Sequence, residues 1–243
     1  MPTLDRTKAA PADDERWARR RSSVVRDALA VAVSTGAYGL SFGAVAATAG
    51  LSLRQASALS LLMFTGASQF ALVGVLAGGG APLAAAATAA LLGARNTLYG
   101  LRLASVLSLR GPRRLLAAHL VIDESSAMAT LREDARESRL AFWATGVAVF
   151  VLWNLATVAG AAGAGRLADP TVLGLDAAAP AAFLALLAPR LGDRSTWALT
   201  AAAAAVALAL TPVVPAGVPI LAAALLVVAV ASRRPRSTAG ATR

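Results

Sequence analysis

Apolar residues run almost without interruption through most of this chain, in blocks that are long enough for helices crossing a membrane. The main blocks lie at about 24–50, 56–78, 83–107, 140–163, 196–211 and 217–231. A membrane-crossing helix needs about 20 mostly apolar residues, and the longer blocks meet that requirement. Turn sequences at 78–82 and 212–219 separate successive blocks. The pattern predicts an all-α, polytopic membrane helix bundle.

Charged residues interrupt the middle of the chain and complicate the expected topology. Block 83–107 contains Arg95, and the shorter stretch 115–131 is broken by Asp123-Glu124. Simple alternation of the first three blocks would place the basic loop 110–114 outside the cell, against the positive-inside rule. Either 83–107 is broken or re-entrant and 115–131 is peripheral, or both stretches cross with a basic loop outside. We prefer the first arrangement, which gives about six full crossings plus one or two broken or re-entrant segments.

Arginine flanks both ends of the apolar region. The net charge is +10, and arginines stand directly before the first block and after the last one. This placement is typical of cytoplasmic membrane flanks and not of a basic face that binds nucleic acid. We therefore expect a disordered basic cytoplasmic tail at 1–27, a transmembrane domain at 28–231, a basic cytoplasmic tail at 232–243, and location in the cell (inner) membrane. The stretch 28–49 is longer than the apolar core of a signal peptide, so we expect an uncleaved helix.

Residue types that support enzyme chemistry are scarce. The chain has no cysteine, and its single histidine is His119. Thiolate chemistry, Zn–thiolate sites and H-E-x-x-H sites are excluded, and no G-x-S-x-G or phosphate-binding loop motif is present. We expect no enzyme activity, no cofactor and no metal.

Arg95 is the most costly residue to insert in a membrane. A charged side chain at the bilayer centre costs about 2.5–3.5 kcal/mol on insertion scales. Its guanidinium either serves a structural ion pair or binds an anionic group such as a substrate carboxylate. Asn96 and Tyr99, next to it and one turn away, would add polar contacts.

Asp123 and Glu124 are the expected partners of that arginine. Adjacent helical residues point about 100° apart, so one carboxylate can pair with Arg95 while the other takes up a proton. A carboxylate removed from water holds a proton more readily, as a proton-coupled carrier requires. An ordinary acidic pair at the end of a loop is the alternative.

Small and uncharged polar residues mark two further apolar blocks. Gly36, Gly39 and Gly43 share a helical face that allows close helix packing in lipid. In block 56–78, Thr65 and Gln69 are four residues apart and are expected on one face. With Gly66 and Ser68 they form either a substrate contact or a set of interhelical hydrogen bonds.

The order of these motifs resembles AzlC, the large subunit of bacterial branched-chain amino-acid exporters. The resemblance rests on Gly39-x-x-Phe42-Gly43, on Phe64-Thr65-Gly66-Ala67-Ser68-Gln69, on Arg95-Asn96-x-x-Tyr99-Gly100, on Asp123-Glu124 and on Gly174-Leu175-Asp176. It implies gradient-driven export of leucine, isoleucine and valine, in some members methionine or toxic analogues, with a small AzlD-type membrane partner subunit. Thr97-Leu98 stands where relatives often carry a histidine, which leaves the substrate open.

The resulting hypothesis is a secondary carrier for small zwitterionic amino acids. The candidate substrate-binding residues are Phe42, Gly43, Thr65, Gly66, Ser68, Gln69, Arg95, Asn96 and Tyr99, and the candidate coupling residues are Asp123 and Glu124. An apolar pocket separates side chains by only about 1–3 kcal/mol per methylene, so shared specificity for branched chains is expected. A passive channel, or a structural subunit whose site lies on the partner, is the alternative.

Overall fold

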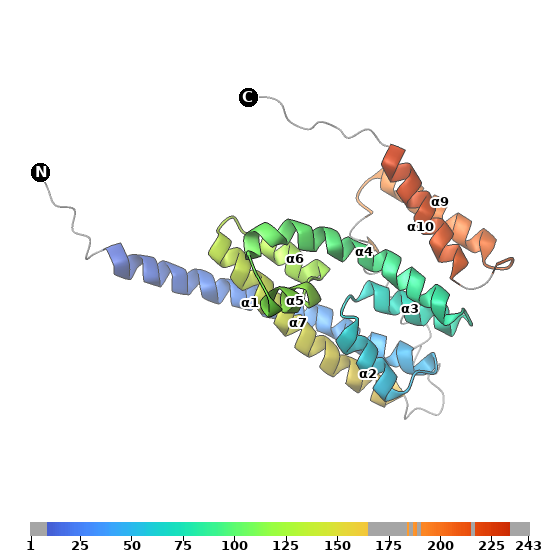
Figure 1. The fold of residues 1–243 in the computed structure, drawn as a ribbon, viewed down its shortest axis with the longest axis horizontal. Helices are drawn as coiled ribbons and strands as arrows, with labels where there is room; N and C mark the ends of the chain where they lie inside the picture. Colours follow the sequence, from blue (N-terminus) through green and yellow to red (C-terminus); the bar gives the residue numbers. More distant parts are fainter. Residues whose placement is uncertain (1–8, 165–183, 185–186, 189–190, 215–216, 234–243) are drawn as a thin grey trace, which may run out of the picture.

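The computed structural model describes the chain apart from residues 1–8, 165–183, 185–186, 189–190, 215–216 and 234–243. Within the described part every regular element is a helix (Figure 1). The all-α prediction is therefore confirmed for these residues. Most of the expected short segment at 177–189, and nearly all of the tail at 232–243, lie outside the described residues.

The helices vary widely in length. They are α1 (Ala9–Thr48), α2 (Leu53–Leu62), α3 (Ala67–Ala77), α4 (Pro82–Leu107), α5 (Pro112–His119), α6 (Asp123–Thr130), α7 (Ala135–Ala164), α9 (Arg194–Leu210) and α10 (Val218–Arg233).

Helices α1 and α7 make the most extensive helix–helix contact in the bundle and run parallel, side by side (Figure 1). A Cβ added to Gly39 would lie 2.6 Å from the Trp153 carbonyl oxygen, and one on Gly43 would meet the Thr157 carbonyl oxygen. Gly160 on α7 is equally close to the Leu40 carbonyl. The glycine face expected in the first block is thus the surface on which α7 packs, because only glycine leaves room for backbone-to-backbone contact.

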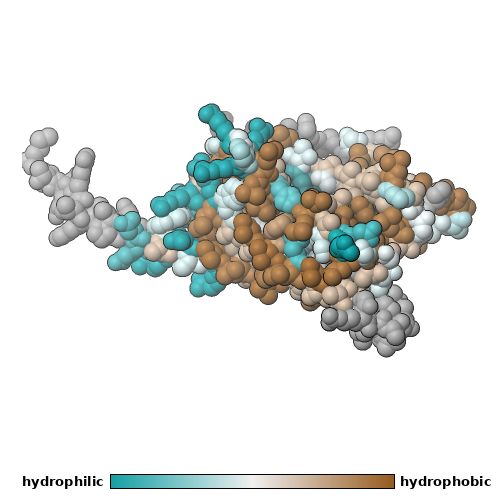
Figure 2. Space-filling view, turned by 60° about the horizontal axis from the view of Figure 1, so that its bottom comes forward, coloured by the Kyte–Doolittle hydropathy of each residue, from teal (hydrophilic) through white to brown (hydrophobic). Residues whose placement is uncertain are grey.

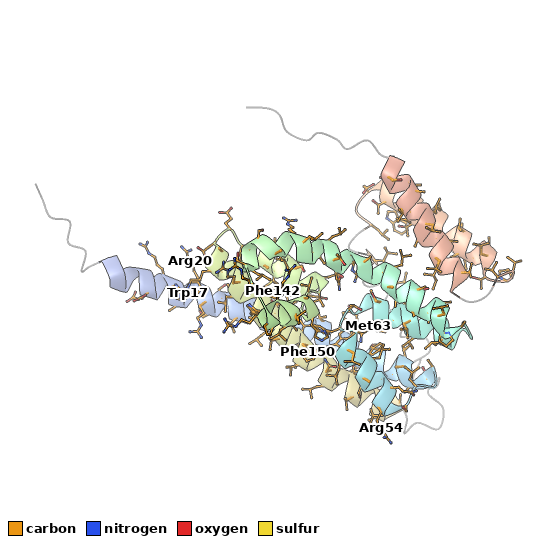
Figure 3. The ribbon with its side chains drawn as sticks, in the orientation of Figure 1. Trp17, Arg20, Arg54, Met63, Phe142 and Phe150 are labelled. Carbon is orange, nitrogen blue, oxygen red and sulfur yellow. The ribbon has the colours of Figure 1, made fainter. Side chains whose placement is uncertain are left out.

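Arginines gather at the end of the bundle where α1 and α7 begin, which we call the arginine end. Arg20 pairs with Glu137 at 3.0 Å, and Arg132 pairs with Asp27 at 2.8 Å. Figure 3 places Trp17 and Arg20 at this end and Arg54 at the opposite one. These ion pairs accompany a helix that extends back to Ala9, into the segment expected to be a disordered tail.

Helix α4 returns from the far end of the bundle to the arginine end. It is continuous over 26 residues, about 39 Å at 1.5 Å per residue, and Arg139 donates from Nε to the Val106 carbonyl beside its last turn. The expectation of an interruption inside 83–107 was therefore wrong. The arginines do not break the helix, because arginine has a high helix propensity.

The interruptions lie elsewhere, in two helical hairpins that enter the bundle from opposite ends (Figure 1). Hairpin A consists of α2 and α3 and comes from the far end, where its second arm packs along the first half of α4. Hairpin B consists of α5 and α6 and comes from the arginine end, where α6 packs on α7. Their tips meet beside the middle of α7: Phe64 lies 5.1 Å from the ring of Phe150, and His119 lies 5.6 Å from it.

The surface and the longest helices are those of a membrane protein. The segments Asp14–Thr48 of α1 and Ala135–Ala164 of α7 are long and apolar enough to cross a bilayer. Figure 2 shows apolar side chains covering the body of the molecule, with hydrophilic ones gathered toward the N-terminal end. Many large apolar side chains on the described helices face outward, for example Leu101 of α4 and Leu155 of α7. Such exposure suits lipid as the surrounding solvent.

Candidate functional site

A cavity of about 70 Å³ lies at the meeting point of the two hairpin tips, α1, α4 and α7. One water needs about 10–15 Å³, so the space accommodates several water-sized groups. Its walls combine apolar rings with charged and hydroxyl groups. The lining residues are Thr35, Tyr38, Phe64, Thr65, Gly66, Ala67, Phe70, Arg95, Ile122, Asp123, Glu124, Val149 and Trp153.

The tip of hairpin A is held open by a glycine and a glutamine. Gly66 has φ +62°, a backbone conformation that favours glycine, and it precedes the first residue of α3. The buried side chain of Gln69 accepts a hydrogen bond from the Gly66 amide at 3.0 Å and donates one to the Leu59 carbonyl at 3.4 Å. One side chain thus forms hydrogen bonds with backbone groups on both sides of the break.

The tip of hairpin B uses the same device with a shorter side chain. Ser125 Oγ accepts from the Ile122 amide at 3.1 Å and donates to the Leu120 carbonyl at 2.6 Å. Like Gln69, it is the third residue of the helix that begins after the break. The two tips are therefore built by one principle although they enter from opposite ends.

As a result, the N-termini of α3 and α6 both point toward the cavity. Thr65 and Gly66, just before α3, and Ala67, its first residue, line the cavity. Ile122, just before α6, and Asp123, its first residue, line it as well. The N-terminus of a helix carries roughly half a positive charge and unpaired backbone N–H groups. Two such ends around one cavity favour negatively charged groups there.

Arg95 reaches the cavity from α4 and forms a two-point ion pair with Asp123. Nε donates to Oδ1 at 3.1 Å, and Nη2 lies 2.9 Å from Oδ2. Both side chains are more than two-thirds buried, with exposed fractions of 28% and 29%. The expected pairing of Arg95 with one of the adjacent carboxylates is confirmed, and the paired residue is Asp123.

Glu124 projects in a different direction from Asp123, toward α1. The Thr35 hydroxyl donates to its Oε1 at 3.5 Å. Among the described residues no cation forms an ion pair with Glu124. The adjacent carboxylates therefore differ in environment, one neutralised by arginine and the other facing the cavity beside a hydroxyl.

A family model described as AzlC protein matches residues 30–167, which is more than half of the chain. The chain belongs to the AzlC family. The matched range runs from the apolar part of α1 to the end of α7 and includes both hairpins and the whole cavity. No curated protein and no solved structure matches this chain. Membership in this family indicates a role related to membrane transport.

The AzlC-family chain brings five of the candidate residues to the cavity wall. These are Thr65, Gly66, Arg95, Asp123 and Glu124. Thr65 lies in the break and Gln69 lies on α3, so these two residues are not on one helical face as expected. The spacing rule fails here because the helix does not continue through 63–66.

The remaining candidates have other surroundings in the structure. Phe42 is fully buried against Phe70 and Trp153, and Gly43 contacts α7. Gln69 braces the hairpin tip, and Ser68 is buried next to Gly93. Asn96 faces a separate groove between α4 and α5, and Tyr99 packs against the apolar core.

Several cavity residues were not among the candidates. Thr35 and Tyr38 come from α1, and Val149 and Trp153 come from α7. Their sequence signal is weak, because a threonine or an aromatic residue in an apolar helix is ordinary core material. Their positions follow from the close packing of α1 on α7, which brings both helices to the hairpin tips.

Proposed function

We propose that this AzlC-family protein is the permease subunit of a secondary carrier that moves branched-chain amino acids out of the cell, together with a small AzlD-type membrane subunit. The observation that carries the proposal is the cavity between the N-termini of α3 and α6, the second helices of two opposed hairpins. Its wall holds an arginine–aspartate pair and a carboxylate, Glu124, that forms no ion pair among the described residues. Transporters commonly place their substrate and coupling-ion sites at such broken helices near the bilayer midplane.

The proposed topology follows from the arginine end. With this end in the cytoplasm, α1, α4 and α7 cross the membrane, hairpin A re-enters from outside and hairpin B re-enters from the cytoplasm. Helices α5 and α6 have eight residues each, about 12 Å, and are too short to cross alone. The unit of α1 with hairpin A and the unit of α4 with hairpin B then have opposite orientations, as in inverted-repeat carriers.

The proposed roles of the lining follow from its chemistry. Phe64, Ile122 and Val149 supply an apolar wall for a branched side chain. A wall of this kind distinguishes one methylene by only about 1–3 kcal/mol, which fits shared use of leucine, isoleucine and valine. Glu124 is the proton-coupling group, because it faces the cavity and forms no ion pair among the described residues, whereas Asp123 is held by Arg95.

Efflux of labelled isoleucine from preloaded cells tests the proposal. Cells that express both subunits should release the label faster than cells with either subunit alone, and a protonophore should abolish the difference. Arg95→Ala should lose most of the efflux at matched expression, whereas Arg102→Ala on the same helix, exposed and away from the cavity, should keep it. Release that persists with the protonophore would favour a passive channel. If no labelled isoleucine is released, the proposal that the protein transports branched-chain amino acids is wrong.

A further inference from the structure

The two helix N-termini at the cavity differ in what neutralises them. The first turn of α6 contains Asp123 and Glu124, so this helix carries its own negative charge. The first turn of α3 has no acidic residue, and its N-cap residue is Gly66, which has no side chain to cap it. A negative group is favourable at either end, but only the N-terminus of α3 lacks one.

Backbone hydrogen bonds at α3 lead to the same conclusion. The Gln69 and Phe70 amides donate to the Gly66 carbonyl, and the Gly66 amide donates to Gln69 Oε1. No described residue accepts a hydrogen bond from the amides of Ala67 and Ser68. Neighbouring free N–H groups at a helix start are a binding site for an oxyanion.

A second donor lies beside this helix start. Trp153 lines the cavity and is buried, with only 4% of its surface exposed. Its Nε1 has no hydrogen-bond partner among the described residues. The Cη2 edge of its ring lies nearest the α3 start, since a Cβ on Gly66 would be 4.0 Å from Cη2. A buried N–H group without an acceptor is unfavourable, and an anionic ligand in the cavity would supply the acceptor.

Arg95 does not fill this role in the structure. Its hydrogen-bonded ion pair is made with Asp123, through two contacts. Glu124 is then the side chain in the cavity wall whose charge is not matched by an ion pair among the described residues. The wall is therefore polarised, with a site for an anion at α3 and a site for a cation at Glu124.

We propose that the cavity orients a zwitterion, with its carboxylate at the start of α3 on the Ala67 amide and Trp153 Nε1, and its ammonium group on Glu124. This assignment rests on the proposed transport of amino acids and deepens it. It moves the carboxylate from Arg95, where the sequence placed it, to the start of α3. Arg95 is a positioning residue that holds Asp123 and the N-terminus of α6.

The assignment predicts that both charged groups of the ligand matter. Binding of radiolabelled leucine to the purified full-length chain with its partner subunit provides the measurement. Leucinamide lacks the carboxylate and 4-methyl-2-oxopentanoate lacks the ammonium group, and each should compete about tenfold or more less effectively than leucine. Equal competition by leucinamide would overturn the carboxylate site, and equal competition by the oxo acid would overturn the ammonium site.

A charge change at α3 tests the location of the carboxylate. Ala67→Asp places a carboxylate in the first turn of α3, and Ala67→Asn is the control of the same size without charge. Ala67→Asp should weaken leucine binding about tenfold or more relative to Ala67→Asn, and should leave leucinamide binding nearly equal in the two variants. Equal leucine affinities in Ala67→Asp and Ala67→Asn would overturn the assignment while leaving the proposed function intact. A wild-type complex that binds no leucine would overturn the proposed function itself.

Discussion

Arg95 and Asp123 join α4 to the first turn of α6 through two contacts, of 3.1 Å and 2.9 Å. Breaking a fully buried ion pair on one side costs about 3–5 kcal/mol, and partial exposure reduces that figure. We expect Asp123→Asn to lower the free energy of unfolding by about 1–3 kcal/mol. Thermal unfolding in detergent, followed by tryptophan fluorescence, provides the measurement.

An exposed pair in the same chain supplies the control. Glu15 and Arg19 lie 3.6 Å apart with side chains more than 70% exposed. Glu15→Gln should change the free energy of unfolding by less than about 1 kcal/mol. If Asp123→Asn melts with the wild type while retaining its fold, the ion pair does not hold hairpin B to α4.

The packing of α1 on α7 depends on glycine at specific positions. A Cβ at Gly43 would meet the Thr157 carbonyl oxygen and lie 2.7 Å from the Ala161 amide nitrogen, both of which are backbone atoms that cannot rotate away. Gly43→Ala should therefore destabilise the bundle by about 1–3 kcal/mol. Gly163→Ala, on α7 with nothing within 4 Å of the added Cβ, should be neutral or stabilising by up to about 1 kcal/mol. Similar melting temperatures for the two variants would contradict the close contact.

Much of this arrangement could be predicted from the sequence, because lipid restricts where charge and glycine can occur. The α1 and α7 helices follow from apolar blocks of sufficient length. The contact of Arg95 with a carboxylate follows from the scarcity of partners in an apolar region. Membership in the family followed from the order of short motifs and is confirmed by the match over 30–167.

The breaks in the hairpins could not be placed with the same rules. Block 56–78 fits a continuous helix, since Thr65 and Gln69 have helical spacing and a single glycine is tolerated in a helix. The local signal was a glycine followed three residues later by glutamine, which is the spacing of a capping box. Trp153 could not be assigned to the cavity at all, because its position depends on how α7 packs against α1 and hairpin A.

Gln69 should contribute more to stability than Gln55, the glutamine at the equivalent position of α2. In Gln69→Leu the Gly66 amide loses its partner inside the protein, which costs about 1–3 kcal/mol, whereas the Leu59 carbonyl keeps the hydrogen bond from the Met63 amide. Gln55 is also the third residue of its helix and accepts from the Ser52 amide at 2.8 Å, but it is exposed to solvent. Gln55→Leu should cost no more than about 1 kcal/mol, because water replaces the lost bond. Equal destabilisation by the two changes would show that the tip of hairpin A is open to water.

The start of α9 should depend on pH. Asp193 accepts hydrogen bonds from the Ser195 and Thr196 hydroxyls and amides, and these bonds hold its pKa well below the ordinary value of 3.8. A lowered pKa in the folded state stabilises the helix start above the unfolded pKa, and this contribution is lost as the pH falls below about 4. Amide exchange at Ser195–Trp197 in Asp193→Ala should exceed that of the wild type at pH 7, and the ratio should fall toward one in acid. A ratio that is independent of pH would show that the carboxylate charge is not involved.

The two hairpins should be reached from opposite sides of the membrane. The natural chain has no cysteine, so a single introduced cysteine reports on one position. Ala81→Cys lies in the exposed turn between hairpin A and α4, and Arg113→Cys lies at the exposed start of hairpin B. With the arginine end in the cytoplasm, a membrane-impermeant maleimide added to intact cells should label the cysteine at 81 and not the one at 113. Permeabilised cells should show labelling of both, which controls for reactivity. Labelling of both positions, or of neither, in intact cells would mean that α4 does not cross the bilayer, and the opposed entry of the two hairpins would then have to be abandoned.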